Sequence, residues 1–425
     1  MNMIKNAGMG VIAVLLIMSA ANISAKDCGN GIAPCECGDT VVSDWTFTGD
    51  MACPAGVAGA HGLTIGADGV TIDGAGYKIT GSKTAEVCDW VGEANPGAGY
   101  CGVNNQGYDD VVIRNLEITD FCTGIGLQGS GANPVVDNLI ENCDLHGNGD
   151  ASCTTDTSTH GMHVCYVSRC VIRGNRIYEN TGTGAGCGDG GNGIFLYAGG
   201  KTFANNTVTG NEIYNNRKGG FFAKKGMQYA EITDNHVYGN GQGGIVLRCM
   251  TSNYNLIEEN NASANYGDGI FIGSQYNVIR NNVVTGNVAG FKIKERDVIG
   301  DGDGIDMGRS RDSNNNTLIS NTVCGNDGVD IDVAVECVGN HGRDNTCDTT
   351  NDYADEGVTT GGCSVRCDGG AVEQETHAAT TTTITATTTS DTPNPTTPGF
   401  TAVAVFVVAV VAVAMDIVLD RKRHG

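Results

Sequence analysis

Apolar residues in the central part of the chain occur in short alternating segments that repeat along the sequence. Each unit contains two asparagines five residues apart, with apolar residues three positions before and two positions after the first asparagine. A third segment opens with glycine and an apolar residue, as in Gly220-Phe221 and Gly244-Ile245. The asparagine pairs are Asn175/Asn180, Asn211/Asn216, Asn235/Asn240, Asn260/Asn265, Asn282/Asn287 and Asn321/Asn326.

The repeat length indicates the class of architecture. Asn211, Asn235, Asn260 and Asn282 follow one another at intervals of 24, 25 and 22 residues. A period of this size with three short alternating segments per unit predicts a solenoid. Leu-x-x-Leu-x-Leu motifs are absent, and Gly and Asn interrupt every segment before a helical run can form. We therefore predict an all-β fold, a right-handed parallel β-helix of about ten coils with three short strands per coil.

The asparagines have a structural explanation in such a fold. Asn tolerates left-handed backbone angles, and its side-chain amide can hydrogen-bond to the equivalent Asn one coil above and below. We expect the pairs to form ladders in the turns.

Two stretches carry a resemblance to a known family. GVTIDGAGYKITG (69–81) resembles its opening coil, and NVIRNNVVTGN (277–287) resembles its repeat. The family groups periplasmic copper-binding proteins with carbohydrate-binding and sugar-hydrolysing β-helix modules, and the resemblance covers residues 63–337. It implies the fold rather than an activity, because the shared residues build coils. The sequence has no cluster of His and Met residues that would bind copper.

The cysteines and the N-terminus indicate an exported chain. Residues 1–25 combine Lys5, an apolar run and Ala25, which is typical of a cleaved signal peptide. All 18 cysteines lie beyond it, and an even number in an exported chain favours disulfides. Two clusters are expected to staple a cap at 26–62 and a cap at 338–372, on either side of the β-helix at 63–337, with zinc as the alternative. These clusters are Cys28/Cys35/Cys37/Cys53 and Cys337/Cys347/Cys363/Cys367.

The C-terminal part resembles a sorting signal. Residues 373–397 are rich in Thr and are expected to form an extended stalk. Pro398, Gly399 and Phe400 open the segment 398–425, which continues with an Ala/Val-rich run and a basic tail. Together they resemble the archaeal PGF-CTERM signal, although Asp416 departs from that pattern. The resemblance implies an archaeosortase as processing partner, a membrane helix or lipid anchor, and an extracellular, surface-anchored protein.

Charge and sequons agree with this location. The formal net charge of −23 makes nucleic acid an improbable partner, because nothing offsets phosphate repulsion over the whole molecule. Asn205, Asn261 and Asn315 begin Asn-x-Ser/Thr sequons, which suit an exported glycoprotein.

Alternation predicts which side chains of the third strand point outward. Counting from the opening glycine, positions 2 and 4 face solvent, and equivalent positions stack about 4.8 Å apart in successive coils. Position 2 holds His163, Phe195, Phe222, Val246, Phe271, Lys292 and Asp330, and position 4 holds Cys165, Tyr197, Lys224, Arg248, Gly273, Lys294 and Asp332. Aromatic rings stack on sugars, and ammonium or guanidinium groups pair with uronate or sulfate. The candidate glycan-binding residues are therefore Phe195, Tyr197, Phe222, Lys224, Arg248, Phe271, Lys292 and Lys294. The alternative is an aromatic ladder that only stabilises the sheet.

Insertions add further candidates. Two long loops leave the same turn in neighbouring coils, and we expect their cysteines, Cys153 and Cys187, to be bonded or close. A third insertion, 295–316, contains Asp301, Asp303 and Asp306 on a Gly-rich stretch. Such carboxylates can gather around calcium, with a solvated acidic loop as the alternative.

Three functions remain open on the sequence alone. The first is binding of a glycan or of a cell-envelope protein through the aromatic and basic face. The second is catalysis by a polysaccharide lyase or epimerase, for which Lys224, Arg248 and Lys294 are candidate bases, or by a glycosidase using Asp330 and Asp332. The third is a rigid spacer in the archaeal envelope.

Overall fold

The structure is a computed structural model that describes residues 25–54, 61–83, 88, 100–150, 159–182, 190–199, 201–248, 251–290, 300–308 and 313–370. The chain divides into Met1–Thr376 and His377–Gly425, and all described residues belong to the first unit. The signal peptide, the Thr-rich stalk and the sorting signal at Pro398, Gly399 and Phe400 therefore lie outside the described residues. Within those residues, no helix is long and apolar enough to cross a membrane.

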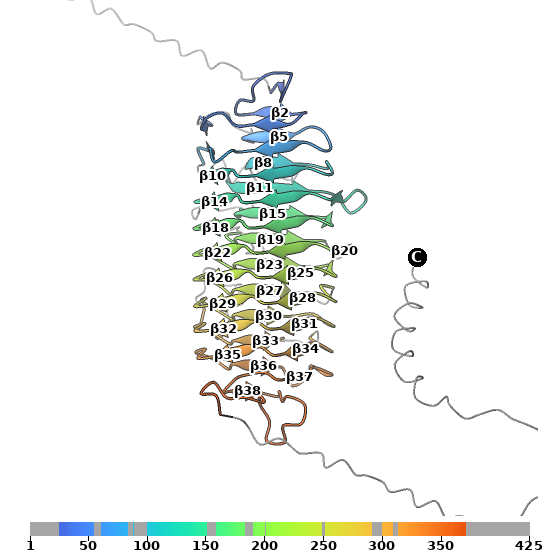
Figure 1. Cartoon of the computed structure of the whole chain (residues 1–425), viewed down its shortest axis with the longest axis vertical. Helices are drawn as coiled ribbons and strands as arrows, with labels where there is room; N and C mark the ends of the chain where they lie inside the picture. The colour runs from blue at the N-terminus through green and yellow to red at the C-terminus, as the bar shows by residue number, and fades with distance from the viewer. Residues whose placement is uncertain are drawn as a thin grey trace, which may run out of the picture. The chain divides into compact units, whose positions relative to one another are not determined.

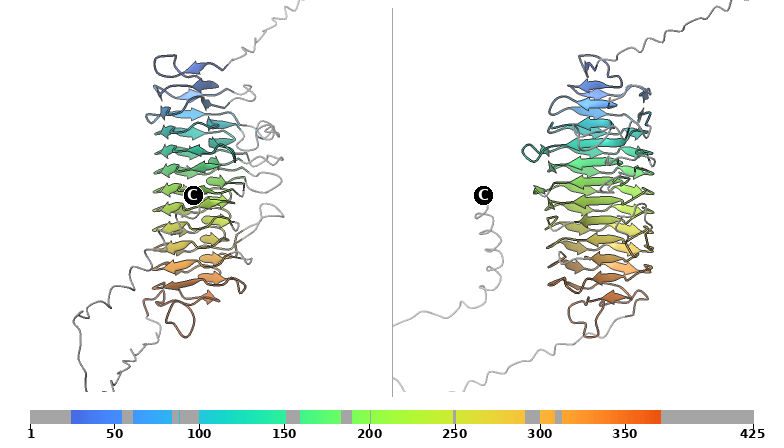
Figure 2. Two further views of the ribbon diagram at one scale, coloured as in Figure 1. Left: turned by 90° about the vertical axis from the view of Figure 1, so that its right-hand side faces the viewer. Right: turned by 180° about the vertical axis from the view of Figure 1, so that it is seen from behind.

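Short parallel strands form three long sheets along one stack of coils (Figures 1 and 2). The 13-stranded sheet runs through β1 (Asp27–Cys28), β2 (Asp39–Val41), β5 (Leu63–Ile65), β8 (Cys101–Asn105), β11 (Thr123–Gln128), β15 (Met162–Cys165), β19 (Ile194–Tyr197), β23 (Phe221–Lys224), β27 (Ile245–Arg248), β30 (Ile270–Ile272), β33 (Ile305–Met307), β36 (Ile331–Val333) and β38 (Thr350–Asn351). The 10-stranded sheet runs through β4 (Met51–Ala52), β7 (Lys78–Thr80), β10 (Glu117–Thr119), β14 (Asp144–His146), β18 (Arg176–Tyr178), β22 (Glu212–Tyr214), β26 (His236–Tyr238), β29 (Asn261–Ser263), β32 (Val283–Thr285) and β35 (Thr322–Cys324).

The 11-stranded sheet completes each coil. It runs through β3 (Trp45–Thr46), β6 (Thr71–Asp73), β9 (Val112–Arg114), β13 (Leu139–Glu141), β17 (Val171–Arg173), β21 (Thr207–Thr209), β25 (Glu231–Thr233), β28 (Leu256–Glu258), β31 (Val278–Arg280), β34 (Thr317–Ile319) and β37 (His341–Arg343). Two extra pairs, β12 (Val135–Val136) with β16 (Val167–Ser168) and β20 (Phe203–Ala204) with β24 (Met227–Gln228), add a fourth strand to some coils. The predicted right-handed parallel β-helix is confirmed.

The core is a stack of aliphatic side chains inside the coils. Each three-residue strand of the 11-stranded sheet buries its middle residue, as at Ile172, Ile232 and Ile279. Parallel register places equivalent residues directly above one another, for example Ile232 on Ile257 and Ile257 on Ile279. One continuous apolar column therefore stabilises neighbouring coils, as expected for a solenoid.

The predicted asparagine ladders are present in the turns. Asn260 is typical: its backbone N–H and its side-chain Nδ2 both donate to Oδ1 of Asn282, at 3.0 Å each. Its own Oδ1 accepts the same two bonds from Asn235. One ladder of this kind runs from Asn175 to Asn345, and a parallel one runs from Asn180 to Asn326. A third ladder, through Asn255, Asn277, Asn316 and Asn340, was not predicted.

Aspartates end both predicted ladders at the C-terminal side. Asp355 accepts from the backbone N–H and the Nδ2 of Asn345, and also from Tyr353 and Ser364. Asp330 accepts from Nδ2 of Asn326 at 3.0 Å. Both aspartates are buried, so each ladder closes inside the fold.

Disulfides lie near both ends of the stack. Cys28–Cys35 and Cys37–Cys53 tie the first coils, whereas Cys347–Cys363 and Cys324–Cys367 tie the last ones. The first cluster thus pairs within itself as expected, while Cys367 takes Cys324 from the repeat rather than a member of its own cluster. A further bond, Cys88–Cys122, was not predicted. Cys153 and Cys187 lie outside the described residues, so their pairing stays a prediction.

Candidate functional site

The outward side of the 13-stranded sheet carries three parallel columns of side chains. Strand register gives the middle column as His163, Phe195, Phe222, Val246, Phe271, Asp306 and Asp332. On one side lies the column Cys165, Tyr197, Lys224 and Arg248. On the other side, before the opening glycines, lies the column His160, Asn192, Gly219, Gly243, Asp268 and Asp303. We call this surface, from β15 to β33, the outer strip.

The register corrects the predicted columns at their C-terminal end. Ile270 pairs with Ile305 and Ile305 with Ile331, so Asp306 and then Asp332 follow Phe271 in the middle column. Lys292 and Lys294 lie outside the described residues, so their position stays a prediction. Asp330 stands one residue before the inward-facing Ile331 and is buried at the end of an asparagine ladder. Asp330 and Asp332 therefore do not form an outward glycosidase pair.

The N-terminal part of the outer strip is an aromatic and histidine cluster. The His160 ring stacks on Phe195, with ring centroids 4.6 Å apart and planes 10° apart. His163 meets the same phenylalanine edge-on at 5.5 Å, and its Nε2 lies 2.9 Å from Sγ of Cys165. Phe195 also stacks with Tyr197 and Phe222. These contacts leave Phe195 only 3% exposed, so it packs within the strip rather than offering a free face to a sugar.

Two titratable groups of this cluster, His160 and Cys165, are held neutral. Burial, together with the neighbouring His163 and Lys218, lowers the pKa of His160 well below its ordinary value. Nδ1 of His160 accepts a bond from the backbone N–H of Asn192 at 3.3 Å, which places the ring proton on Nε2. Burial raises the pKa of the Cys165 thiol to about 12, so it is not an activated nucleophile. His160 and Cys165 can donate hydrogen bonds and pack against a ligand, but neither carries a charge near neutral pH.

Half-buried aromatic and basic side chains occupy the next coils. Tyr197, Lys224 and Arg248 are in register on β19, β23 and β27, and each is partly exposed. Phe222 and Phe271 stand beside them in the middle column, also partly exposed. Of the eight predicted glycan contacts, the structure thus brings these five together on one face.

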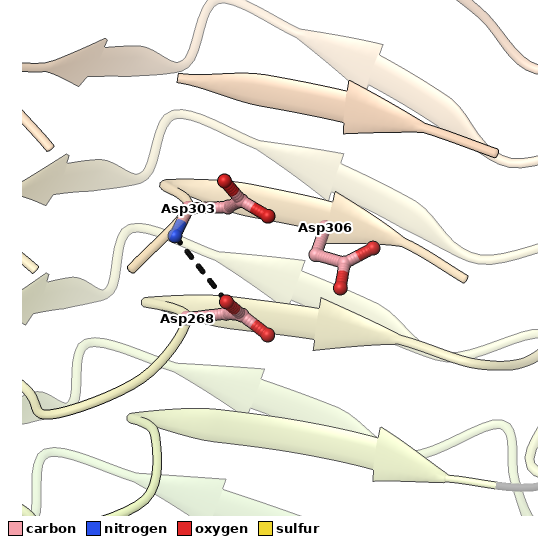
Figure 3. A group of neighbouring side chains, drawn as sticks. All are labelled: Asp268, Asp303 and Asp306. Carbon is pink, nitrogen blue, oxygen red and sulfur yellow. Dashed lines mark hydrogen bonds between the residues drawn. The ribbon is translucent and has the colours of Figure 1, made fainter. Parts of the chain in front are cut away.

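Three buried carboxylates lie at the C-terminal part of the outer strip (Figure 3). Asp268, Asp303 and Asp306 each offer a carboxylate oxygen, and these oxygens lie within 4.8 Å of one another. The Asp303 backbone N–H donates to Asp268 Oδ1 at 3.2 Å, and Asp303 Oδ1 accepts from the Val329 N–H at 2.7 Å. Carboxylate oxygens gathered this closely fit a hard divalent cation such as Ca²⁺, which offsets their mutual repulsion.

The sequence predicted this acidic group only in part. Asp303 and Asp306 belong to it, whereas Asp301 is exposed and stands outside the group. Asp268 was missed because it precedes the insertion, yet the sequence repeats Asp-Gly-Ile at 268–270 and 303–305. Aligning the two coils on that tripeptide would have found it.

Comparisons with known proteins agree with the fold. Residues 187–347 match the family model of the right-handed β-helix region, and residues 98–249 match that of the periplasmic copper-binding protein NosD. No curated protein matches the sequence.

Several solved structures are similar in fold at low sequence identity. XylC with xylose has 14% identity and a TM-score of 0.41, over 64% of this chain and 43% of that chain, less than half its length. The Azotobacter vinelandii mannuronan C-5 epimerase AlgE4 A-module has 15% identity and a TM-score of 0.44, over 73% of this chain and 79% of that one. Pectate lyase Pel9A has 15% identity and a TM-score of 0.40, over 75% and 69%.

Proposed function

We propose that this protein is exported, anchored at the cell surface, and binds an acidic polysaccharide along the outer strip. The observation that carries the proposal is the alignment of Tyr197, Lys224 and Arg248 beside Phe222 and Phe271 on four consecutive coils. Strands in neighbouring coils are about 4.8 Å apart, so these side chains span about 14 Å along the stack. An extended sugar chain lying along the stack would meet an aromatic or basic group at every coil.

The two basic side chains of the outer strip, Lys224 and Arg248, favour an acidic ligand. Arg and Lys pair with carboxylate or sulfate through charge-assisted hydrogen bonds, and partly exposed aromatic rings supply apolar contact. Calcium at Asp268, Asp303 and Asp306 would add a positive group in the two coils that follow Arg248. A bound cation there would pair with a further acid group of the same polymer.

The test is binding of the purified full chain to neutral, uronate and sulfated polysaccharides, with calcium and with a chelator. We expect calcium-dependent binding of one acidic polymer. Lys224→Ala and Arg248→Ala should each weaken it about tenfold, the loss of one charge-assisted hydrogen bond of ~1.5 kcal/mol. Lys225→Ala is the matched control, since Lys225 is the exposed neighbour in the turn beyond β23 and should leave affinity unchanged.

The outcomes separate the competing functions. Folded protein that binds none of the polymers would refute the proposal and leave the envelope spacer. Capture of an envelope protein with no polysaccharide affinity would refute it in favour of a protein partner. Release of unsaturated sugars, seen by ultraviolet absorbance, would replace binding by lyase chemistry, with Lys224 and Arg248 as candidate bases.

Export and anchoring rest on the two terminal segments and are supported by the match to a periplasmic family model. Fractionation of cells that produce the full chain tests them. We expect the protein in the surface fraction, and replacement of Pro398, Gly399 and Phe400 by alanine should change its C-terminal processing, read by mass spectrometry of the last peptide. A full-length chain retained in the cytoplasm would contradict this part of the proposal.

A further inference from the structure

An exposed column of tyrosines lies at one corner of the stack, away from the outer strip. Tyr229, Tyr254 and Tyr276 occupy equivalent corner positions and are 54%, 45% and 44% exposed. Their rings stack face to face, with centroids 5.3 and 5.1 Å apart and planes within 9° and 8° of parallel. All three have positive φ, of 50°, 62° and 58°, a conformation that bulky residues seldom adopt.

The positions that flank the tyrosines along the stack are both sequon asparagines. Asn205 precedes Tyr229 by one coil, because β20 pairs with β24 and the Asn205 N–H donates to Gln228. Asn315 follows Tyr276 by one coil, because the Tyr276 N–H donates to Asn314. Asn205 and Asn315 begin Asn-Asn-Thr sequons, and they share the same positive-φ corner, at 62° and 56°. The corner column is therefore Asn205, Tyr229, Tyr254, Tyr276 and Asn315.

These two asparagines differ from the ladder asparagines beside them. Asn206 and Asn316 are buried, and their side-chain amides donate to backbone carbonyls of Val167 and Ser274. The side-chain amides of Asn205 and Asn315 make no hydrogen bond to any described residue, and Asn205 is exposed. Asn315 is half-buried, so Asn205 is the more accessible of the two.

Ring stacking covers the inner faces of the tyrosine column, and the outer ring face at each end of the column is not covered by another described ring. Both faces of Tyr254 are occupied by its neighbours, whereas Tyr229 and Tyr276 each have one face that no other described ring covers. Asn205 and Asn315 occupy the same corner one coil before Tyr229 and one coil after Tyr276, and coils are spaced about 4.8 Å apart. Positive φ accounts for an asparagine at each end of the column, but neither backbone conformation nor ring stacking accounts for the threonine two residues later that completes each sequon.

We propose that Asn205 and Asn315 are N-glycosylated, and that the innermost sugars pack on the end faces of Tyr229 and Tyr276. In the modification the side-chain Nδ2 displaces the phosphate of a lipid-linked oligosaccharide. A bond forms from nitrogen to the anomeric carbon, the bond from that carbon to the phosphate oxygen breaks, and the lipid phosphate leaves with its electrons while one amide proton is released. The inference depends on export and is independent of polysaccharide binding at the outer strip.

Mass spectrometry of glycopeptides tests the modification. The full chain is taken from the surface fraction of a host that N-glycosylates exported proteins, so a failure of export is recognised separately. We expect oligosaccharide on Asn205 and Asn315. Thr207→Ala should remove it from Asn205 and Thr317→Ala from Asn315, while Thr322→Ala, at an exposed strand threonine outside any sequon, should change neither. Surface-located chain without sugar on these two asparagines overturns the proposal.

The packing of the sugars is tested by crossed variants. Tyr229→Ala should speed periodate oxidation of the glycan on Asn205 but not of that on Asn315, and Tyr276→Ala should do the opposite. The expected increase is about two- to tenfold, the scale of one stacking contact. Tyr254→Ala is the matched control, because it leaves both end faces in place. Oxidation rates at the two sites that do not respond to their own tyrosine would overturn the packing of sugar on the ring.

Discussion

Removal of one ladder asparagine should show how far the side-chain ladders stabilise the coils. Asn260 is 1% exposed, and its Nδ2 donates to Oδ1 of Asn282 and to the carbonyl of Ile232, at 3.0 and 2.8 Å. Its Oδ1 accepts from the backbone N–H and the Nδ2 of Asn235. In Asn260→Ala the Nδ2 of Asn235 keeps its bond to Val208, but the Asn235 N–H loses the side-chain oxygen that it donates to.

The expected loss follows from these contacts. An unsatisfied buried N–H costs about 1–3 kcal/mol, and each further hydrogen bond contributes about 0.5–1.5 kcal/mol net. We therefore expect Asn260→Ala to lower the free energy of unfolding by about 3 kcal/mol. The matched control is Asn261→Ala at the adjacent, exposed strand position, which should change it by less than about 0.5 kcal/mol.

The assay is urea-induced unfolding followed by circular dichroism, on full-length protein from a host without N-glycosylation. Hydrogen exchange at the Asn235 and Asn282 amides reports whether the loss is local to the neighbouring coils, as a one-dimensional solenoid implies. Equal midpoints for the Asn260 and Asn261 variants would refute the view that the ladder contributes net stability.

Three further predictions concern the ends of the stack and its histidines. Asp355→Asn places an NH₂ group against several donors and should cost about 2–3 kcal/mol in urea unfolding. Cys324→Ser with Cys367→Ser should cost about 2–4 kcal/mol, since the bond closes a 43-residue separation, and proteolysis should then begin in the last coils. Burial lowers the pKa of His61 to about 4, below its unfolded value of 6.5. The unfolded state therefore binds the proton first, so stability should fall as pH drops from 6.5 to about 4, by up to about 3 kcal/mol, and His61→Gln should flatten that slope.

The repeat could be predicted because its signals are local and periodic. A pair of asparagines five residues apart, with aliphatic residues between and beside them, predicts both a turn and a buried strand in each repeat. The ladders that begin at Asn175 and Asn180 confirm this prediction. The third ladder was visible in the same way, since Asn255, Asn277 and Asn316 each stand five residues before a predicted one. The pairwise pattern does not include these asparagines, because the third ladder precedes each pair by five residues.

The outer strip was harder to predict because insertions break the period. Counting on from Gly328 placed Asp330 at position 2, but Ile331 is in register with Ile305, so Asp330 takes the place of the opening glycine and Asp332 takes position 2, a shift of two residues. Alternation of inward and outward residues also does not predict how exposed an outward-pointing side chain is. Phe195 has the predicted direction, yet His160, Tyr197 and Phe222 pack around it. That contact depends on tertiary structure, which period and polarity do not encode.

The aspartates that close the ladders give the stack a direction and an end. In the two predicted ladders each asparagine accepts hydrogen bonds from the coil before it and donates hydrogen bonds to the coil after it. A last asparagine in either ladder would offer its N–H groups to one more coil, from this chain or from another copy. An ionised carboxylate only accepts hydrogen bonds, and Asp330 and Asp355 therefore terminate the two side-chain ladders. Open parallel stacks tend to polymerise end to end. Here a carboxylate, which has no N–H to donate, stands in place of the next side-chain amide at two positions, and this opposes such polymerisation.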